Sequence, residues 1–534
     1  MPASCGEVLI QLLDEHGVNT VFGIPGVHTI ELYRGLAHSN ISHYTPRHEQ
    51  GAGFMADGYA RVTGKPGVCF LITGPGVTNA ATALAEAYSD SVPLLAISSV
   101  NQTRELGMGT GRLHELPSQH NLASQFTVFS HTVLDPAELP HVLARAFTVF
   151  ESERPGPVHI AIPIDVPVAA GTRGKPMARA FARPGPDPDA ITEAVKLLQG
   201  ARKPVAIFGG GALDASTEAI ALVERFQIPA VLTIAGKGVI PADHALCLGA
   251  SLPFGPVLEL IRDADVILAV GTEFAETDLL YTGADLEING PMIRIDVEAQ
   301  QLVRNFTPEI PILSDAKLAL RALVAQAGKE KVNHGHERER CVSEIRGVLA
   351  SCFPASAAKH LRILDLLASV LDDETVVVSD STQLAYTACH AYPTRHPRRF
   401  MFPLGFGALG YGLPAAIGAK IGRPELPVVC IVGDGGLMFT LEEMAAAMEF
   451  GTPVVLLVWN NRGYGEIRDA MVASGVVPIG VDLEPPDFVA VAKGFGWEAH
   501  RATTLRRLSR TLAASLQSGE PSLIEIDASG EFTS

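Results

Sequence analysis

Positive charge and aromatic residues are both scarce in this sequence of 534 residues. Lysine and arginine total 41 against 58 aspartates and glutamates, so the formal net charge is −17. Only 6% of the residues are aromatic, and two of these are tryptophans. A chain with this charge is a poor partner for nucleic acid or for an anionic membrane surface, because both are polyanions. Neither is expected as the main partner.

Cysteine pairs and long apolar runs are also missing. The seven cysteines are scattered, odd in number and without a CxxC pair, which is typical of a reducing compartment and not of a disulfide framework or zinc site. No uncharged apolar stretch reaches the roughly 18 residues that a membrane span needs. The first residues, MPASCGEVLIQLLDEHG, contain acids where a signal peptide requires a basic start. We therefore expect a cytoplasmic protein.

The length and the alternation of apolar runs predict several α/β domains. At roughly 150 residues per domain, 534 residues suggest about three. In the first third, buried parallel strands are expected at 68–73, 93–99 and 158–164, with a helix at 79–90 between them.

Two further blocks repeat this pattern. Polar or proline-rich segments at 166–190 and 328–340 read as boundaries. The sequence predicts an α/β protein of three consecutive doubly wound domains with mainly parallel sheets, at 1–170, 190–328 and 350–534. Further strands are expected at 204–210, 230–234, 265–271 and 292–297, and at 375–380, 427–433, 453–459 and 522–527.

The segment PVVCIVGDGG (427–436) combines an apolar strand with a glycine turn that contains one acid. Ligands in α/β folds bind at the carboxyl ends of strands, and glycines allow backbone N–H groups to approach an anion there. A carboxylate at this place would repel a phosphate unless a cation lay between them. Asp434 therefore suggests a bound Mg²⁺ or Ca²⁺ that bridges protein and phosphate oxygens.

One helix and one strand later, the chain reaches Asn460 and Asn461, which should emerge beside Asp434. An amide oxygen is a neutral hard ligand suited to complete the coordination of such a cation. GDG alone is a common strand–helix turn. Followed by paired asparagines one αβ unit later, it predicts a diphosphate held through a metal.

A GDG motif followed by roughly 25–30 residues and NN resembles the signature of thiamine diphosphate (ThDP) enzymes, within the acetolactate synthase/2-oxo acid decarboxylase superfamily. The resemblance covers the whole chain and implies a pyrimidine-binding domain, a central Rossmann-like domain and a diphosphate-binding domain, in that order. It implies that Mg²⁺ is bound by the side chains of Asp434 and Asn461 and by the Gly463 carbonyl.

The same resemblance assigns the remaining cofactor contacts. The segment VVSDSTQLA (377–385) matches a diphosphate-contacting position, and PLGFGALGYGLPAAIGA (403–419) matches the segment that holds the cofactor bent. In the second segment, Leu409 would lie between the two rings and the Gly407 carbonyl would accept from the aminopyrimidine. The implied diphosphate contacts are Gly433, Gly435, Gly436, Ser381 and Thr382.

Glu49, in the segment TPRHEQGAGFMADGYAR (45–61), matches the glutamate that these enzymes use to activate the cofactor. In the family this carboxyl hydrogen-bonds the pyrimidine nitrogen, so Glu49 is predicted to be both a cofactor-binding and a catalytic residue. Alone, a glutamate at a helix start is usually a solvated surface acid. The family's pyrimidine domain serves the diphosphate domain of another subunit, which implies a homodimer or homotetramer.

Three pocket residues are predicted from the loops that resemble the family's substrate site. His28 and His114 would transfer protons, a task suited to imidazole, although either could be an ordinary packed histidine. Glu466 would face the substrate, with Glu115 near the same cleft. A carboxylate in such a pocket suits a guanidinium, which it binds through two hydrogen bonds. Alternatively, Glu466 is only an ion-pair partner of Arg462 or Arg468.

The loop pattern PGVHTIELYRGL and GRLHELP resembles that of 2-ketoarginine (5-guanidino-2-oxopentanoate) decarboxylases. The activity this implies is non-oxidative decarboxylation of a cationic 2-oxo acid to an aldehyde and CO₂. The alternative is a carboligase like acetolactate synthase or benzaldehyde lyase, although the Phe-Gln pair of acetolactate synthases is missing.

Two readings from other classes are weaker. The glycines of PVAIFGGGALDAS (204–216) are adjacent where a Rossmann fingerprint spaces them, which disfavours a nicotinamide oxidoreductase. An inactive regulatory homologue is disfavoured because Glu49, Asp434 and Asn461 are all present. We expect ThDP and Mg²⁺ as cofactors, and a central domain without FAD.

Overall fold

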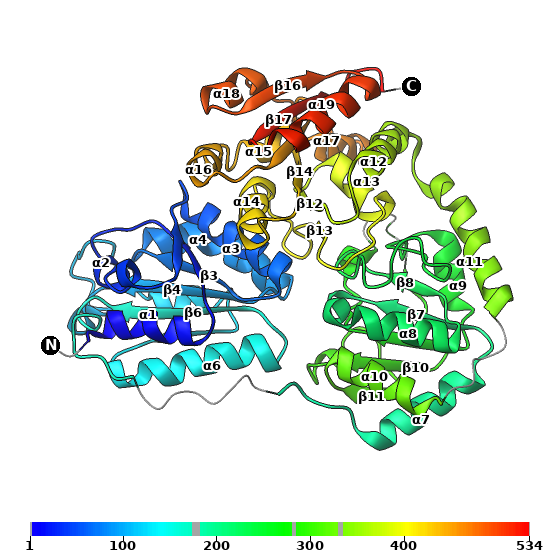
Figure 1. Ribbon diagram of the computed structural model, residues 1–534, viewed down its shortest axis with the longest axis horizontal. Helices are drawn as coiled ribbons and strands as arrows, with labels where there is room; N and C mark the ends of the chain where they lie inside the picture. Colours follow the sequence, from blue (N-terminus) through cyan, green and yellow to red (C-terminus); the bar gives the residue numbers. More distant parts are fainter. Residues whose placement is uncertain (1–2, 174–181, 280–282, 284, 329–334, 533–534) are drawn as a thin grey trace.

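The computed structural model describes residues 3–173, 182–279, 283, 285–328 and 335–532, which form three α/β domains (Figure 1). Each domain contains one sheet, and every strand pair within the three sheets is parallel. The N-terminal domain (blue to cyan) and the central domain (green) lie side by side, and the C-terminal domain (yellow to red) lies across both. The predicted fold class is confirmed.

The N-terminal domain has a six-stranded sheet in the order β2-β1-β3-β4-β6-β5. Its central strands are buried along their whole length, which explains why they are continuous apolar runs in the sequence. Its strands are β1 (Thr20–Gly23), β2 (Ser42–Tyr44), β3 (Gly67–Leu71), β4 (Leu94–Val100), β5 (Phe129–Thr132) and β6 (Pro157–Pro163), and its helices are α1 (Cys5–Glu15), α2 (Ile30–Tyr33), α3 (Glu49–Thr63), α4 (Pro75–Ser89), α5 (Gln119–Ala123) and α6 (Leu139–Ser152).

The central domain has a five-stranded sheet in the order β11-β10-β9-β7-β8, and its own separate core. Its strands are β7 (Pro204–Phe208), β8 (Ala230–Leu232), β9 (Val266–Val270), β10 (Met292–Asp296) and β11 (Ile310–Leu313), with helices α7 (Pro188–Gly200), α8 (Ser216–Phe226), α9 (Gly255–Arg262) and α10 (Ala316–Gln326), and α11 (Gly335–Leu349) follows.

The C-terminal domain has a six-stranded sheet in the order β13-β12-β14-β15-β17-β16. Strands β14 and β15 lie next to each other in its middle and are fully buried. Its strands are β12 (Val376–Ser379), β13 (Phe400–Met401), β14 (Val428–Gly433), β15 (Val455–Asn460), β16 (Glu498–Ala502) and β17 (Ser522–Asp527), and its helices are α12 (Ala358–Val370), α13 (Gln383–Ala391), α14 (Gly412–Gly422), α15 (Asp434–Leu437), α16 (Glu443–Phe450), α17 (Gly465–Ala473), α18 (Phe488–Gly494) and α19 (Leu505–Ser518).

All the strands expected from apolar runs are present, with ends that differ by at most two residues from the expected ones. The helix expected at 79–90 is α4, which begins four residues earlier at Pro75. Parts of the two expected boundary segments, 174–181 and 329–334, lie outside the described residues. Among the described residues, no helix is both long and apolar enough to cross a membrane.

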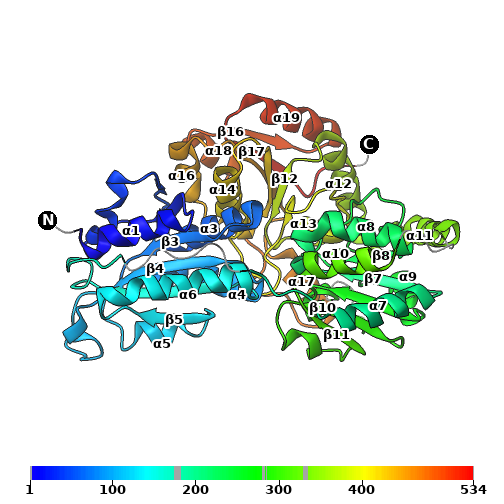
Figure 2. The ribbon, with the colours of Figure 1, turned by 60° about the horizontal axis from the view of Figure 1, so that its bottom comes forward.

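Helix α3 of the N-terminal domain packs directly against helix α14 of the C-terminal domain (Figure 2). Glycines make this close approach feasible. A Cβ atom on Gly58 would lie 2.0 Å from the Ala415 carbonyl oxygen, and one on Gly418 would lie 1.9 Å from the Met55 carbonyl oxygen. Because both obstacles are backbone atoms, no side-chain movement could relieve the overlap.

The central domain is joined to the C-terminal domain by the buried Lys237. Its ammonium group donates to the carbonyl oxygens of Ala388 (3.0 Å), Cys389 (3.0 Å) and Tyr392 (2.7 Å). These carbonyls are at the C-terminal end of α13, where the helix dipole favours a cation. Burial lowers the pKa of Lys237 to about 7, whereas three carbonyl acceptors favour the charged form. The N-terminal end of α13 carries Gln383, close to the predicted diphosphate residues.

We predict that Gly58→Ala destabilises the protein by about 1–3 kcal/mol, because overpacking against fixed backbone forces α3 and α14 apart. Chemical denaturation would measure this loss. The matched control is Gly347→Ala in α11, where a Cβ atom meets nothing within 4 Å. That substitution should stabilise by about 0.5–1 kcal/mol through helix propensity. Equal effects of the two variants would contradict the close helix contact.

Candidate active site

The two halves of the predicted metal motif lie at the carboxyl ends of adjacent strands. Strand β14 ends at Gly433, which pairs with Trp459 of β15, and Asp434 opens the short helix α15. Asn461 directly follows β15. The parallel register therefore brings together two residues that are 27 positions apart in the sequence, as the strand–helix–strand pattern predicts.

Three oxygen atoms converge at this edge without a proton between them. The Asn461 Oδ1 atom lies 2.7 Å from the Gly463 carbonyl oxygen and 3.1 Å from Asp434 Oδ1. The other carboxylate oxygen of Asp434 accepts from the Gly463 N–H at 2.9 Å. Burial raises the pKa of Asp434, and hydrogen bonds from backbone N–H groups oppose that shift.

The direction of the Asn461 amide determines whether this is a cation site. Its Nδ2 donates to Gln383 Oε1 at 3.0 Å, which turns its oxygen toward the other two. The opposite orientation would donate to Gly463 and Asp434, but it would place two oxygens, those of Asn461 and Gln383, against each other. A cation between the three oxygens satisfies every group. Ligands around Mg²⁺ at 2.0–2.1 Å in an octahedron are about 2.9 Å apart, close to the separations observed.

The donor set is one carboxylate with two neutral oxygens, which suits a metal that also binds phosphate oxygens. Across the described residues, no three histidine, cysteine, aspartate or glutamate side chains gather as a metal site. The site is therefore visible only when amide and backbone oxygens are considered.

Asn460 is not part of this group, although both asparagines were expected beside the aspartate. It is the last residue of β15, and its amide donates to Glu525 at 2.7 Å. Its oxygen accepts from the Arg462 N–H at 3.1 Å. Successive residues of a strand point to opposite faces, so only one of the two asparagines can reach the oxygens of Asp434 and Gly463, which with Asn461 form the metal group.

The predicted diphosphate residues lie around the same strand ends. A Cβ atom on Gly433 would be 2.8 Å from the Thr382 hydroxyl oxygen, and one on Gly435 would be 2.7 Å from the Tyr464 ring. Both glycines therefore leave room that any side chain would fill. The buried Asp380 accepts from the Ser381 N–H at 2.8 Å, which fixes the start of the segment with Ser381 and Thr382.

The loop with Gly407 and Leu409 is held by two acids of the N-terminal domain, one in α4 and one at its C-cap. Glu86 accepts from the Ala408 N–H at 3.0 Å, and Asp90 accepts from the Gly405 N–H at 2.7 Å. Gly407 has φ +68° and is exposed, so its position favours glycine. Leu409 is half-buried. The loop that is predicted to hold the cofactor rings is thus positioned by another domain.

Glu49 begins α3, directly after the helix cap His48. Its Oε2 atom accepts from the Asn79 amide of α4 at 2.9 Å. This contact orients one carboxylate oxygen and leaves the other for a ligand. Asn79 was not singled out from the sequence, because an asparagine within an alanine-rich helix resembles an ordinary exposed residue.

His28 and His114 are brought together although 86 residues separate them. Their rings pack edge to face with centroids 5.4 Å apart. His28 Nδ1 lies 3.0 Å from the Thr73 hydroxyl, which in turn donates to Ser99 at 3.0 Å. Burial and the neighbouring His114 both lower the pKa of His28. His114 has φ +61°, and its carbonyl oxygen lies against Gly74.

Glu115 makes hydrogen bonds within its own loop. Its carboxylate accepts from the N–H groups of Gly109 (2.8 Å), Gly111 (2.7 Å) and Arg112 (2.9 Å), and these bonds lower its pKa. Three of the roughly four acceptor positions of the carboxylate are therefore occupied by the loop. A contact between Glu115 and a guanidinium stays a prediction.

Glu466 lies on the first turn of α17, directly after the metal group, and is solvent-exposed. Although the residue as a whole is exposed, its carboxyl is partly buried, and this raises the pKa of Glu466. The negative charge of Asp469 acts in the same direction, and a hydrogen bond from Gln383 opposes the shift. The nearest candidate for an ion pair on the helix, Arg468, is bound to Asp482 at 2.6 Å. Of the two arginines that the alternative named, Arg468 is thus engaged by Asp482.

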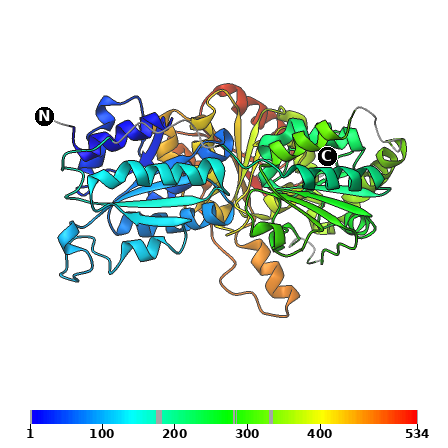
Figure 3. The same cartoon turned by 90° about the horizontal axis from the view of Figure 1, so that it is seen from below.

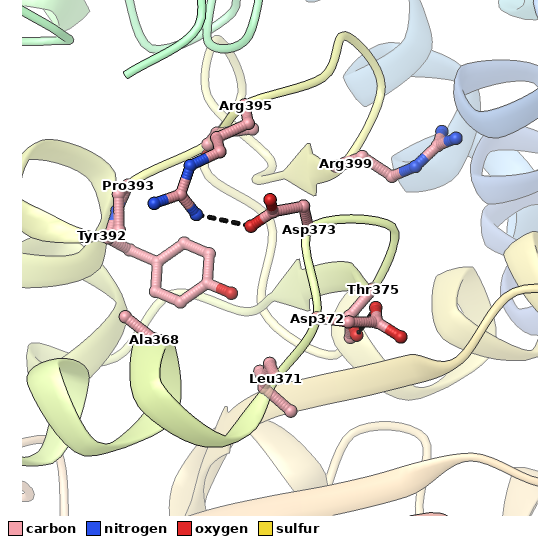
Figure 4. Close-up of a pocket in the computed structure, with 10 residues that line it drawn as sticks. Ala368, Leu371, Asp372, Asp373, Thr375, Tyr392, Pro393, Arg395 and Arg399 are labelled. Atoms are coloured by element: carbon pink, nitrogen blue, oxygen red, sulfur yellow. Dashed lines mark hydrogen bonds and ion pairs between the residues drawn. The ribbon is translucent and has the colours of Figure 1, made fainter. Parts of the chain in front are cut away.

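A small pocket elsewhere in the C-terminal domain contains none of the predicted residues (Figure 4). It is lined by residues at the end of α12 and after α13, where Arg395 forms an ion pair with Asp373. The candidate active site is therefore the set of strand ends and loops described above.

Family models for thiamine pyrophosphate enzymes match all three domains. The N-terminal TPP binding domain matches residues 3–124, the central domain 191–323 and the C-terminal TPP binding domain 380–526.

Among curated proteins, the chain is 46% identical to a probable 2-ketoarginine decarboxylase, AruI, of Pseudomonas aeruginosa, over 98% of this chain and 94% of that protein. It is 32% identical to the acetolactate synthase isozyme 1 large subunit of Escherichia coli, over 92% of this chain and 88% of that protein. A probable acetolactate synthase large subunit of Methanococcus aeolicus is 31% identical, over 97% and 91% respectively.

We predict that Glu86 makes the protein less stable as the pH rises. Burial and Asp90 raise the pKa of this carboxyl to about 8, against an opposing effect of Arg61. Because the folded state keeps a proton that the unfolded state releases near pH 4.3, this contribution is complete below about pH 4.3 and is lost as pH rises through about 8. Glu86→Gln should reduce the fall in melting temperature between pH 5.5 and 8.5 by a few degrees.

Differential scanning fluorimetry across this range would measure the difference. Glu520→Gln is the matched control, since Glu520 is exposed and remote from the loop. The prediction fails if the Glu86 variant and the wild type lose stability in parallel over the whole range.

Proposed function

Because this chain belongs to the thiamine pyrophosphate enzymes, we propose that the site described above binds ThDP with Mg²⁺ and decarboxylates 5-guanidino-2-oxopentanoate to an aldehyde and CO₂. The observation that carries the cofactor site is the convergence of three unprotonated oxygens at the strand ends. The observation that carries the substrate is the 46% identity to a probable 2-ketoarginine decarboxylase over nearly the whole chain.

The metal would be held by Asp434, the Asn461 amide oxygen and the Gly463 carbonyl; this is supported by the 3.1 Å and 2.7 Å separations of the Asn461 oxygen from the other two. Gly433, Gly435, Gly436, Ser381 and Thr382 would surround the diphosphate, supported by the room beside Gly433 and Gly435. The exposed Gly407 and the half-buried Leu409 would contact the rings. When bound, the cofactor supplies the carbon nucleophile and the electron sink that decarboxylation requires.

Glu49 would hold the proton that the cofactor's pyrimidine nitrogen shares. Asn79 binds one carboxylate oxygen, so the other can be presented in a constant direction. A residue in this role is a general acid, and its contribution depends on the mobile proton rather than on shape.

His28 would move a proton to or from the substrate. If the Thr73 hydroxyl donates to Ser99, it accepts from His28 Nδ1, which leaves the Nε2 lone pair of His28 available. His114, 5.4 Å away between ring centroids, is the second proton carrier. Lowering of the His28 pKa by burial favours the neutral ring, the form that can take up a proton.

Glu466 would bind the guanidinium of the substrate. It lies three residues beyond Gly463, on the chain that leaves the metal group, and Arg468 is already bound to Asp482. A planar guanidinium pairs with a carboxylate through two parallel hydrogen bonds, which would set both affinity and orientation.

Carboligation is the second candidate function. Acetolactate synthases of two organisms match more than 90% of this chain at 31–32% identity. Such an enzyme would join a second 2-oxo acid or an aldehyde to the first product instead of releasing it.

We further propose a homodimer or homotetramer with active sites at subunit interfaces. Apolar side chains are exposed on both candidate halves: Val27 is 66% and Ile30 58% exposed beside His28. Helix α17 and the chain after it extend away from the body of the molecule (Figure 3) and expose Val477 (82%) and Ile479 (78%). Exposed apolar surfaces of this kind usually become buried in an interface. We propose a second copy of this chain as the partner, because the resemblance to the family implies a homo-oligomer.

We predict that Glu49→Gln lowers turnover by about 10²–10⁴-fold while ThDP with Mg²⁺ still binds, because only the transferable proton is removed. Steady-state kinetics and isothermal titration calorimetry would measure the two quantities. Glu153→Gln, an exposed acid of the same domain, should leave both unchanged. An active Glu49→Gln variant would contradict the proposed role.

Mixing two inactive variants tests the interface. If Glu49 and Asp434 of one site come from different subunits, subunit exchange between Glu49→Gln and Asp434→Ala proteins creates hybrids with one intact site. We expect activity to return, up to about a quarter of the wild-type value for a random mixture of dimers. No recovery despite demonstrated exchange would show that each site lies within one subunit.

We predict that Glu466→Gln raises KM for 5-guanidino-2-oxopentanoate by about tenfold and leaves KM for the neutral 2-oxopentanoate nearly unchanged, because only the cation loses a charged partner. CO₂ release from neutral, acidic and cationic 2-oxo acids would be measured. Glu115→Gln is the comparison, since that carboxylate is engaged by its own loop. Acetolactate from pyruvate, with no aldehyde from the guanidino acid, would favour carboligation.

A further inference from the structure

Two side chains outside the metal group continue its hydrogen bonds. The Asn461 Nδ2 donates to Gln383 Oε1 at 3.0 Å, and the Gln383 Nε2 donates to Asp469 Oδ2 at 2.9 Å. Gln383 is the first residue of α13, Asp469 belongs to α17, and Asn461 follows β15. Three segments that are separate in the sequence therefore meet in one chain of contacts.

The chemistry of Asp469 sets the direction of this chain. An ionised carboxylate can only accept, so the Gln383 nitrogen faces Asp469 and its oxygen faces Asn461. Asn461 then presents its nitrogen to Gln383, and its oxygen lies 3.1 Å from Asp434 Oδ1. Each amide has one donor end and one acceptor end, so reversing one requires reversing the other.

The direction of the Gln383 amide is important because, without a metal, Asp434 and Gly463 favour the reverse orientation of the Asn461 amide. Turned round, its nitrogen would donate to the Gly463 carbonyl at 2.7 Å and to Asp434 at 3.1 Å. A reversed Asn461 requires a reversed Gln383, whose oxygen would then face the Asp469 carboxylate. That repulsion between two acceptors opposes the change and keeps the Asn461 oxygen directed at the cation position.

Gly465 keeps the two amides in contact. A Cβ atom at this position would lie 2.3 Å from Asn461 Nδ2 and 2.9 Å from Gln383 Oε1. A larger residue would push Asn461 away from Gln383. Because Gly465 has no side chain, the two amides can approach to the 3.0 Å of their hydrogen bond.

We propose that Gln383 and Asp469 are positioning residues that fix the amide orientation of Asn461 and thereby raise the affinity for the divalent cation. This inference rests on the metal site proposed above. Neither residue touches the cation position; both act through the direction of a hydrogen bond. The Glu466 carboxyl also accepts a hydrogen bond from Gln383, so it supplies a second, weaker acceptor for the same amide.

The test uses Mn²⁺ as the probe, with the full-length protein and saturating ThDP, and measures bound Mn²⁺ by electron paramagnetic resonance. Gln383→Leu should weaken Mn²⁺ binding by about 10- to 100-fold, the usual effect of losing a group that orients a metal ligand. Asp469→Ala should weaken it less, by about three- to tenfold, because Glu466 remains as an acceptor. Glu484→Ala, which removes an exposed acid from the chain beyond α17, should have no effect.

Gln383→Glu separates orientation from packing. A carboxylate accepts from Asn461 whichever way it turns, but it would be repelled by Asp469. Combined with Asp469→Asn, whose amide can donate to it, Gln383→Glu should therefore keep Mn²⁺ affinity within about threefold of the wild type. In the Gln383→Glu background, Asp469→Ala should not weaken binding, because Asp469 has no amide left to orient and its removal relieves the repulsion between two carboxylates. This non-additivity is the specific signature of the proposed chain.

The outcomes are distinct. Equal Mn²⁺ affinity in the wild type, Gln383→Leu and Asp469→Ala overturns the inference. Equal losses in Gln383→Leu and in the Gln383→Glu/Asp469→Asn double variant also overturn it, because packing and not hydrogen-bond direction would then be responsible. Wild-type protein that binds no Mn²⁺ with ThDP would instead refute the metal site itself, whereas the decarboxylase activity is tested separately by CO₂ release.

Discussion

Three oxygen atoms that face one another without a proton are the constraint on which the proposed site depends. The Asn461 oxygen lies 2.7 Å from the Gly463 carbonyl oxygen and 3.1 Å from the Asp434 carboxylate, and it would be repelled by both in the absence of a cation. Around them, glycines keep the strand ends open, and buried groups fix the adjacent loops. The fold therefore holds an arrangement that becomes favourable only with a ligand, as expected where local stability is given up for function.

Contacts between domains extend this constraint over the whole molecule. Lys237 of the central domain holds the C-terminal end of α13, whose first residue, Gln383, contacts Asn461. Glu86 of the N-terminal domain holds the loop of Gly407. All three domains thus contact elements that carry the proposed site residues, although those residues come from two of them. The central domain contacts the helix that begins with Gln383.

Much of the architecture could be predicted because parallel strands buried on both faces leave continuous apolar runs. Strands β3, β4, β14 and β15 are of this kind. Six strands of two to five residues were not expected, because runs this short carry no clear period; they are β1, β2, β5, β11, β13 and β16. The metal motif was predictable for a related reason: adjacent parallel strands bring their ends together.

The sequence by itself determined the three-domain α/β order, the family and the residue types at the strand ends, because apolar periodicity and motif spacing are local properties. Only the tertiary structure decided which asparagine reaches the metal group, that Glu115 is used by its own loop, and that His28 meets His114. It also revealed Asn79, Gln383 and Asp469, which have no motif of their own. Hydrogen-bond direction depends on partners from distant segments, and spacing along the chain does not encode it.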